Sequence, residues 1–287
     1  MLQPEPTVGD TSWFTRDRFG LFIHWGLYAL PARHEWVKHK EEIPDEVYEK
    51  YFKHFDPDLY DPALWADAAA GAGMKYFVVT TKHHEGFCLW DSKLTEYKAT
   101  NTPCGKDLLR PMVDAFRSRD LRVGFYHSVI DWHHPHYLVD PYIGPYRNAE
   151  DRAAMNEGRD QMKYADYLHG QTRELLTEFG DVDILWYDFS YPQRGPEGKG
   201  RKDWRSEELV KLVRELRPNI ILNDRLDLPD KPGAWDMKTP EQFQPRRWVH
   251  VDGKPVVWEA CQTFSGSWGY HRDEASWKSV EQLLLML

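Results

Sequence analysis

One acidic residue, Asp188, directly follows the apolar run at residues 184–187, which is typical of a buried strand. A buried parallel strand has no favourable place for a charge in its middle, but its C-terminal end opens into the cleft of an α/β fold. A carboxylate at that end either caps the next loop or takes part in acid–base or nucleophilic chemistry. Asp188 is therefore the first candidate for a functional residue.

Polar side chains also stand at the ends of the other predicted strands. They supply imidazole, phenol, guanidinium and carboxyl groups: His24, His83, Tyr126, Arg225, Glu241 and Glu259. Because the C-terminal ends of parallel strands meet at one face of an α/β fold, we expect these groups to face a common site.

The adjacent pair His83-His84 raises the alternative of a metal site. Neighbouring residues in a strand point to opposite faces, so such a pair rarely chelates one ion, although this alternation breaks at a strand end. The sequence contains no HExxH motif. Neutral imidazoles that donate hydrogen bonds to hydroxyl groups are the favoured interpretation. A metal-dependent hydrolase, with His24, His83 and Asp188 as ligands, is the alternative.

The elements that must position these groups alternate along the chain. Seven stretches predict strands: residues 20–26, 76–81, 121–126, 184–188, 219–225, 235–238 and 256–261. Helical patterns stand between most of them and at the end: residues 44–55, 62–74, 107–119, 160–179, 206–216 and 277–287. This alternation predicts parallel βαβ units, and functional groups at strand ends favour a (β/α)8 TIM-like barrel. A doubly wound sheet is the alternative, but no GxGxxG follows the first strand.

The predicted barrel looks incomplete at its C-terminal end. We recognise no eighth strand. The chain ends on the apolar run at residues 283–287, which should pack against another apolar surface. A polar insertion extends from residue 131 to about residue 148. A length of 287 residues suits one barrel domain. We therefore predict a single domain over residues 1–287, with a barrel that is truncated or closed in another way.

Composition limits the partners of the chain. The formal net charge is −9 and there is no basic stripe, which argues against nucleic acid. The 13 Trp, 15 Tyr and 13 Phe residues must mostly form an aromatic core, but they also suit a carbohydrate site, because aromatic faces stack on sugar rings.

The cysteines and the N-terminus bear on the compartment. Cys88, Cys104 and Cys261 are odd in number and have no CxxC spacing, which indicates free thiols in a reducing compartment. Residues 1–10 lack the apolar region of a signal peptide, and no stretch reaches transmembrane length. As written, the chain is expected to be cytoplasmic and free of membranes, unless a signal peptide was removed from it.

Short motifs near the predicted strand ends carry a family resemblance. In chain order they are Trp13-Phe14, residues 19–26 (FGLFIHWG), Glu35-Trp36, residues 82–87 (KHHEGF), residues 185–188 (LWYD), Asn223-Asp224-Arg225, Trp258-Glu259 and residues 267–270 (SWGY). Each motif is weak alone, but in this order across the chain they resemble glycoside hydrolase family 29, the α-L-fucosidases. The catalytic domain of that family is similar to a TIM barrel, often followed by a C-terminal β-sandwich that we do not expect in this chain.

The resemblance implies a retaining mechanism, which needs two carboxyl groups about 5–5.5 Å apart. Asp188 matches the nucleophile and must be ionised. Glu241, which follows Pro240, is the best match to the acid/base, and Glu259 is the alternative. The acid/base must hold a proton near neutral pH, through partial burial or a nearby negative charge. The implied activity is exo-acting hydrolysis of terminal α-L-fucose, without a metal or a cofactor.

The resemblance also implies which residues line a fucose pocket. They are His24, Glu35, Trp36, His83, His84, Tyr126, Trp186 and Arg225. Tyr187 stands where some relatives carry a smaller or polar residue, and we expect it to alter the pocket wall. The partner would be a fucosylated oligosaccharide or glycoconjugate, with linkage and oligomeric state left open. An inactive fucose-binding barrel is a further alternative, against which the presence of both candidate carboxylates argues.

Overall fold

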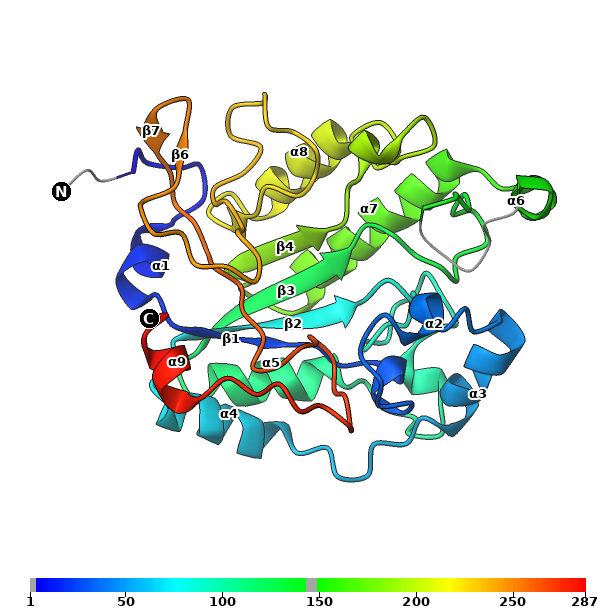
Figure 1. The fold of residues 1–287 in the computed structure, drawn as a ribbon, viewed down its shortest axis with the longest axis horizontal. Helices are drawn as coiled ribbons and strands as arrows, with labels where there is room; N and C mark the ends of the chain where they lie inside the picture. The colour runs from blue at the N-terminus through cyan, green and yellow to red at the C-terminus, as the bar shows by residue number, and fades with distance from the viewer. Residues whose placement is uncertain (1–3, 143–148) are drawn as a thin grey trace.

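The computed structural model of the chain describes residues 4–142 and 149–287, and a parallel β-sheet lies at its centre (Figure 1). Its strands follow one another in chain order, and every neighbouring pair is parallel. They are β1 (Gly20–Ile23), β2 (Tyr76–Lys82), β3 (Arg122–Ser128), β4 (Ile184–Asp188) and β5 (Ile221–Leu222). The prediction of an α/β fold with a parallel sheet is therefore confirmed.

Beyond β5 the chain continues in the same direction without forming full strands. Single parallel bridges join Asn223 to Met237, Lys238 to Trp258 and Glu241 to Cys261. The segments predicted as strands at 235–238 and 256–261 thus run side by side as extended chain. Pro240 and Pro255 have no backbone N–H to donate, which limits how far a hydrogen-bonded ladder can extend here.

Four helices each precede a strand of the sheet. They are α4 (Pro62–Gly71), α5 (Leu109–Arg117), α7 (Gln161–Glu178) and α8 (Ser206–Leu216). Asp61 accepts hydrogen bonds from the first backbone N–H groups of α4, and Asp160 does the same at α7, so both helices begin at side-chain caps. α4 packs beside α5 and α7 beside α8. The two pairs appear below and above the strands in Figure 1.

The remaining elements lie in the connections. They are α1 (Ser12–Asp17), η1 (Leu27–Ala29), α2 (Val37–Lys40), α3 (Asp45–His54), η2 (Ala99–Asn101), α6 (Ala149–Asn156), η3 (Pro192–Arg194), β6 (His250–Val251), β7 (Lys254–Pro255) and α9 (Val280–Leu284). The antiparallel pair β6–β7 was not predicted. The predicted helix at 277–287 was too long, because a capping box at Ser279 starts α9 later. Residues 143–148 of the predicted insertion lie outside the described residues.

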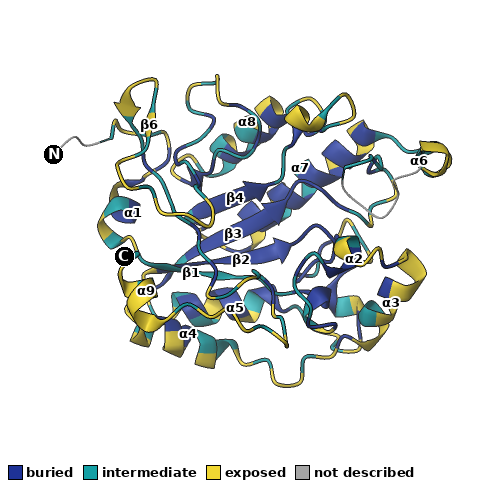
Figure 2. Cartoon of the chain, in the orientation of Figure 1, coloured by how far each residue is buried: buried dark blue, intermediate teal, exposed yellow. Residues whose placement is uncertain are grey.

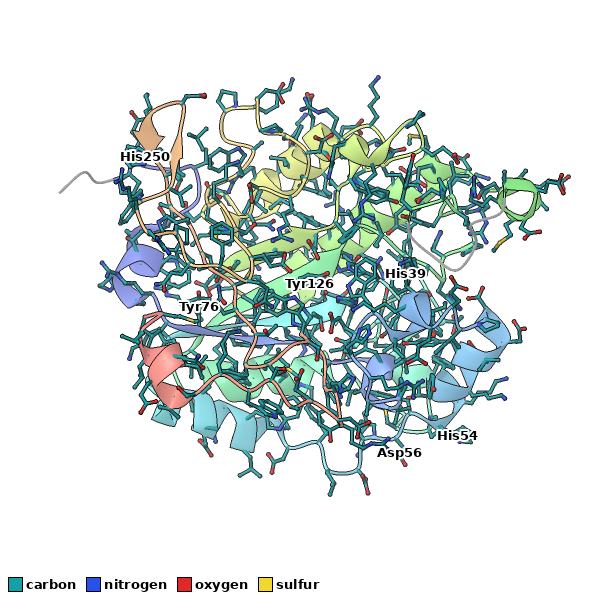
Figure 3. The ribbon with its side chains drawn as sticks, in the orientation of Figure 1. His39, His54, Asp56, Tyr76, Tyr126 and His250 are labelled. Carbon is teal, nitrogen blue, oxygen red and sulfur yellow. The ribbon has the colours of Figure 1, made fainter. Side chains whose placement is uncertain are left out.

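The sheet separates two apolar clusters, and Figure 2 shows β2, β3 and β4 as buried and the edge strand β1 as intermediate. Leu185 and Tyr187 belong to the larger cluster, which includes the helices. Ile184 and Trp186 belong to the smaller one, together with Val257 and other residues. This alternation follows from the two-residue period of a strand. Tyr126 of the smaller cluster lies near the middle of the molecule (Figure 3).

A groove of about 850 Å³ lies between β1 and the last part of the chain. β1 is an edge of the five-stranded sheet, so no strand in the described residues pairs with its outer side. Phe22, Trp258 and Trp268 line this groove, and so do Leu283 and Leu287. The apolar C-terminal run therefore borders the groove, although Leu284, Leu285 and Leu287 stay more than half exposed. An eighth strand is not found in the described part of the chain. No described helix is long and apolar enough to cross a membrane.

Candidate active site

The site is built around Asp188, the last residue of β4. Asp188 is 9% exposed, and its carboxylate accepts hydrogen bonds from the Tyr126 hydroxyl and from Arg225 Nη1, each at 2.8 Å. Burial raises the pKa of Asp188, while the charge of Arg225 and the hydrogen bond from Tyr126 oppose that rise. Phe189 follows with a φ of 82°, an uncommon backbone conformation for a bulky residue. The strand thus ends in a buried carboxylate with both oxygens hydrogen bonded.

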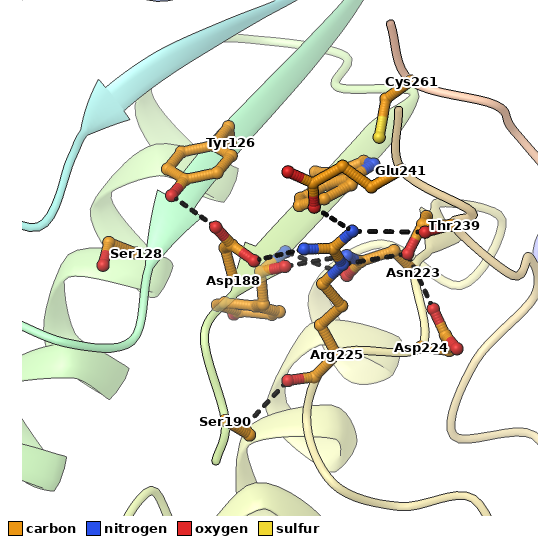
Figure 4. A network of polar contacts seen from close by, with 12 residues as sticks. Tyr126, Ser128, Asp188, Ser190, Asn223, Asp224, Arg225, Thr239, Glu241 and Cys261 are labelled. Atoms are coloured by element: carbon orange, nitrogen blue, oxygen red, sulfur yellow. Dashed lines mark hydrogen bonds and ion pairs between the residues drawn. The ribbon is translucent and has the colours of Figure 1, made fainter. Parts of the chain in front are cut away.

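Arg225 joins Asp188 to a second carboxylate, that of Glu241 (Figure 4). Its Nη2 donates to Glu241 Oε2 at 2.8 Å, and its Nε donates to the Thr239 hydroxyl at 3.0 Å. Burial acts against the charge of Arg225, but the two carboxylates outweigh burial and raise its pKa. The side chain of Glu241 is 38% exposed, against 12% for Asp188. One planar guanidinium therefore holds a buried and a more accessible carboxylate side by side.

Glu259, the alternative acid/base, has different partners. Glu241 Oε1 accepts a hydrogen bond from Trp268 Nε1 at 3.2 Å. Glu259 instead accepts from the Tyr76 hydroxyl at 2.7 Å and from Trp186 Nε1 at 3.0 Å. Burial raises the pKa of Glu259, and these two donors oppose the rise. Both oxygens of Glu259 are thus held by ring donors, whereas Glu241 shares the guanidinium with the central aspartate.

Three imidazoles gather around Tyr126, and one of them lies beside Asp188. The ring of His83 stacks on Tyr126 with centroids 5.5 Å apart, and it lies 4.0 Å from the ring of His84. His84 Nε2 lies 4.0 Å from Asp188 Oδ2. Burial lowers the pKa of His24 to about 3, and burial also holds the pKa values of His83 and His84 well below their usual value. The three rings are therefore neutral near pH 7, and each can exchange hydrogen bonds with hydroxyl groups.

Glu35 and Trp36 come from the connection that follows β1. Glu35 is 6% exposed and accepts the backbone N–H groups of Trp268 at 3.1 Å and Gly269 at 2.7 Å. Burial raises the pKa of Glu35, and these N–H groups lower it. Trp36 packs edge to face on His84 with centroids 4.8 Å apart. Glu35 therefore holds the loop around Gly269, while Trp36 forms a wall beside the imidazoles.

The structure adds two aromatic residues that the predicted pocket omitted. Trp268 stacks on His24 with centroids 5.1 Å apart, and Phe22 packs edge to face on Trp186 at 5.5 Å. Phe22 stands two residues before His24, so strand periodicity was a signal for it. Trp268 belongs to the SWGY motif. That motif does not follow a predicted strand, so its position in the site was not predicted.

Tyr187 does not line the site, contrary to the expectation from sequence. It is fully buried, and its hydroxyl is hydrogen bonded to the Thr172 hydroxyl of α7 at 2.9 Å. Strand alternation directs Tyr187 toward the helices and Trp186 toward Asp188. The residue type at position 187 therefore affects packing of α7 rather than the pocket wall.

The metal-dependent alternative finds no ligand set in the described residues. Across 4–142 and 149–287, no group of three or more His, Cys, Asp and Glu side chains could hold a metal ion. His24, His83 and Asp188, the ligands proposed for that alternative, therefore do not form such a group.

Two carboxylates on one guanidinium, beside neutral imidazoles and aromatic rings, form a site suited to a sugar. A buried carboxylate of this kind can attack a carbon, and a more accessible one can exchange a proton with a leaving group or water. The sequence profile described as Alpha-L-fucosidase matches residues 7–287. The chain belongs to the α-L-fucosidase family. The resemblance seen in the sequence is thereby confirmed.

Similar proteins place this family member among known fucosidases. It is 36% identical over 290 residues to the tissue alpha-L-fucosidase of Macaca fascicularis, a match that covers 92% of the chain and 56% of that protein. Its structure is similar to alpha-L-fucosidase isoenzyme 1 from Paenibacillus thiaminolyticus, with a TM-score of 0.89, 50% identity and coverage of 96% of this chain and 65% of that one. The chain therefore spans less than two thirds of the length of either relative.

A third relative bears on the mechanism. An alpha-L-fucosidase of glycoside hydrolase family 29 from Bacteroides thetaiotaomicron was solved as a trapped covalent intermediate with 2-fluoro-fucosyl fluoride. It has a TM-score of 0.80 and 28% identity to this family member, with coverage of 98% of this chain and 67% of that one.

Proposed function

We propose that this chain carries the catalytic site of a retaining exo-α-L-fucosidase, which removes terminal α-L-fucose from oligosaccharides or glycoconjugates. The observation that carries the proposal is the guanidinium of Arg225, which binds the buried carboxylate of Asp188 and the more exposed one of Glu241. Membership of the family and the covalent intermediate of the Bacteroides relative support the same reading.

In the first step, Asp188 attacks the anomeric carbon while Glu241 donates a proton to the departing glycosidic oxygen. The C–O bond to the leaving group breaks, and an ester between fucose and Asp188 forms. Burial acts against ionisation of Asp188, and Arg225 together with Tyr126 keeps it available as a carboxylate. In the second step, Glu241 takes a proton from water, the water attacks the same carbon, and the ester bond breaks.

We assign binding of the sugar to the residues around these carboxylates. The neutral rings of His24, His83 and His84 can hydrogen bond to hydroxyl groups without a net charge. Trp36 and Trp268 offer aromatic faces for the apolar side of a sugar. A related fucosidase, AlfC from Lactobacillus casei, was solved in complex with Fucα(1,6)GlcNAc. That complex supports a fucosylated oligosaccharide as the substrate class for this chain as well.

For the fold, we propose that the sheet is the major part of a (β/α)8 barrel. Five parallel strands in chain order, extended by the bridges after β5, follow the strand order of such a barrel. Asp188, His83 and Arg225 lie at or just after strand C-termini, where TIM barrels carry their sites. A cytoplasmic location and independence from metals and cofactors stay predictions.

Hydrolysis of a 4-nitrophenyl α-L-fucoside tests the proposed activity, with the matching α-L-rhamnoside and β-D-galactoside for comparison. We expect turnover of the fucoside, and α-L-fucose as the first product in a proton NMR time course, because two inversions retain configuration. Asp188→Asn, purified in the same way, controls for contaminating hydrolases. A β-configured first product would refute retention, and absence of fucoside hydrolysis would refute the activity.

A further inference from the structure

Glu259 does not bind Asp188 or Glu241 directly. One residue that it binds is, however, in contact with the groups that hold them. Its segment runs beside residue 238, since Glu259 N–H donates to the Lys238 carbonyl at 2.9 Å. Its carboxylate spans to two strands of the sheet, accepting from Tyr76 of β2 and Trp186 of β4. In Figure 3, Tyr76 lies between Tyr126 and the end of the molecule that carries α1. Glu259 therefore fixes the indole of Trp186 from the side remote from α7.

The indole of Trp186 in turn supports the two donors that hold the nucleophile. The guanidinium carbon of Arg225 lies 4.4 Å from the centre of the Trp186 ring. The ring of Tyr126 stacks on the same indole, with centroids 5.7 Å apart and planes 21° apart. Tyr126 and Arg225 also donate hydrogen bonds to the carboxylate of Asp188. A rotation of the indole would therefore displace both donors at once.

We propose that Glu259 is a positioning residue for the hydrolysis of fucosides. Its carboxylate holds Trp186, and Trp186 holds Tyr126 and Arg225 in the orientation that aims Asp188 at the anomeric carbon. Glu259 transfers no proton in this scheme, because its partners are Tyr76 and Trp186 of the smaller apolar cluster, whereas Glu241 shares a guanidinium with Asp188. This inference rests on the proposed fucosidase function and assigns the acid/base role to Glu241 alone.

Two substitutions separate positioning from proton transfer. In Glu259→Gln, the amide oxygen can still accept the Trp186 N–H, and the amide nitrogen can donate to the Tyr76 hydroxyl, which then acts as an acceptor. The contacts survive, but the group can no longer act as an acid or a base. In Glu259→Ala, both contacts are lost and a buried indole N–H is left without its partner.

We expect Glu259→Ala to lower kcat for aryl α-L-fucosides by roughly 10- to 100-fold, the range for loss of one hydrogen bond to a charged group. The factor should be the same for good and poor leaving groups, since aiming of the nucleophile does not depend on protonation of the departing oxygen. Glu259→Gln should restore most of the rate. Tyr76→Phe is the matched control, because it removes the other donor to Glu259 and leaves the contact with Trp186, so its effect should be smaller.

A double-mutant cycle tests the route through the indole. In a Trp186→Phe background the N–H is absent, so Glu259→Ala should cause little additional loss. Additive losses would overturn the proposal, as would a Glu259→Ala variant with the rate of the unchanged chain. It also fails if Glu259→Gln is as impaired as Glu259→Ala and azide rescues the alanine variant with retained configuration, which would make Glu259 the acid/base. Melting temperatures of all variants identify any that fail to fold. If Glu259→Ala is one of them, kcat of Glu259→Gln is compared with that of the wild-type chain.

The proposed function and this inference can fail separately. If the unchanged chain cleaves fucosides, the variants decide the role of Glu259. If it cleaves none, the proposed activity fails, and calorimetric binding of L-fucose replaces turnover as the readout. Weaker binding by Glu259→Ala, with recovery in Glu259→Gln, would then support positioning of the site. Equal binding by all variants, or absence of binding by the unchanged chain, would overturn it.

Discussion

Removal of Arg225 should make the stability of the protein depend on pH in a defined direction. The side chains of Asp188 and Arg225 are 12% and 21% exposed, so this pair is largely buried. Breaking a buried ion pair by removing one partner costs about 3–5 kcal/mol. The contact of Arg225 with Glu241 adds little, because that carboxylate is 38% exposed and surface pairs contribute about 0–1 kcal/mol. The penalty in Arg225→Ala therefore falls on Asp188.

Asp188 can escape this penalty by taking up a proton. Burial already raises the pKa of Asp188, and Arg225 is the main charge that opposes the rise, so Arg225→Ala raises the pKa further. The folded state then binds more protons than the unfolded state, so stability falls as the pH rises through the folded pKa of Asp188. Relative to the wild-type chain, the loss in free energy of unfolding should be small at acidic pH and approach about 3 kcal/mol or more above that pKa.

Denaturant unfolding from acidic to neutral pH measures this loss, and Arg225→Lys serves as the matched control. Lysine keeps a positive charge near Asp188 but has no fork to span two carboxylates, so an intermediate loss is expected. The acidic limb of the kcat/KM profile on an aryl fucoside should also move to higher pH in Arg225→Ala, because a protonated Asp188 cannot attack. A loss of stability that is independent of pH, or an acidic limb that stays in place, would refute this account of the pair.

Three further substitutions test other parts of the site. Asp188→Gly should abolish nearly all fucoside turnover, and azide should restore activity with formation of the opposite anomer; turnover near that of the wild-type chain would contradict a nucleophilic role. Glu241→Ala should slow cleavage of natural fucosides far more than formation of the intermediate from a nitrophenyl fucoside, because an activated phenol leaves without a proton, and an equal loss on both would argue against the acid role. Glu35→Ala should weaken fucose binding, measured by calorimetry, by roughly 10-fold or more, since two backbone N–H groups around Gly269 lose a buried acceptor; unchanged affinity would show that the loop keeps its place without Glu35.

The sequence was informative where a side chain stands at the end of a long, strongly patterned strand. Asp188 follows such a run, and β4 indeed ends there. The stretches around 235–238 and 256–261 were predicted as strands and form only single bridges, and the neighbouring Pro240 and Pro255 have no backbone N–H to extend the pairing. Strand periodicity also indicates which of two adjacent residues faces the site, because it places Trp186 and Tyr187 on opposite sides of the sheet.

Contacts between distant loops could not be read from local patterns. Glu35 and Gly269 meet across 234 positions of the chain, and their hydrogen bond depends on the path of the whole sheet. Glu259 was recognised as a candidate acid, but its partners at positions 76 and 186 became visible only when the sheet brought three segments together. The contacts of Arg225 are a similar case, because the sequence does not reveal whether an arginine side chain binds one carboxylate or two.

The alternation of side chains along β4 also bears on how the protein would respond to laboratory evolution. Leu185 packs among the helices, so substitutions there meet the larger cluster and leave the surroundings of the carboxylates in place. Trp186 touches Arg225, so substitutions there alter the electrostatics next to the reacting sugar. Changes at sites without shared partners combine almost additively. A selection for heat tolerance should therefore enrich substitutions on the side of the sheet that faces the helices, and a selection for a new sugar should enrich substitutions on the side of Trp186. The two selections could be run in separate rounds with little interference.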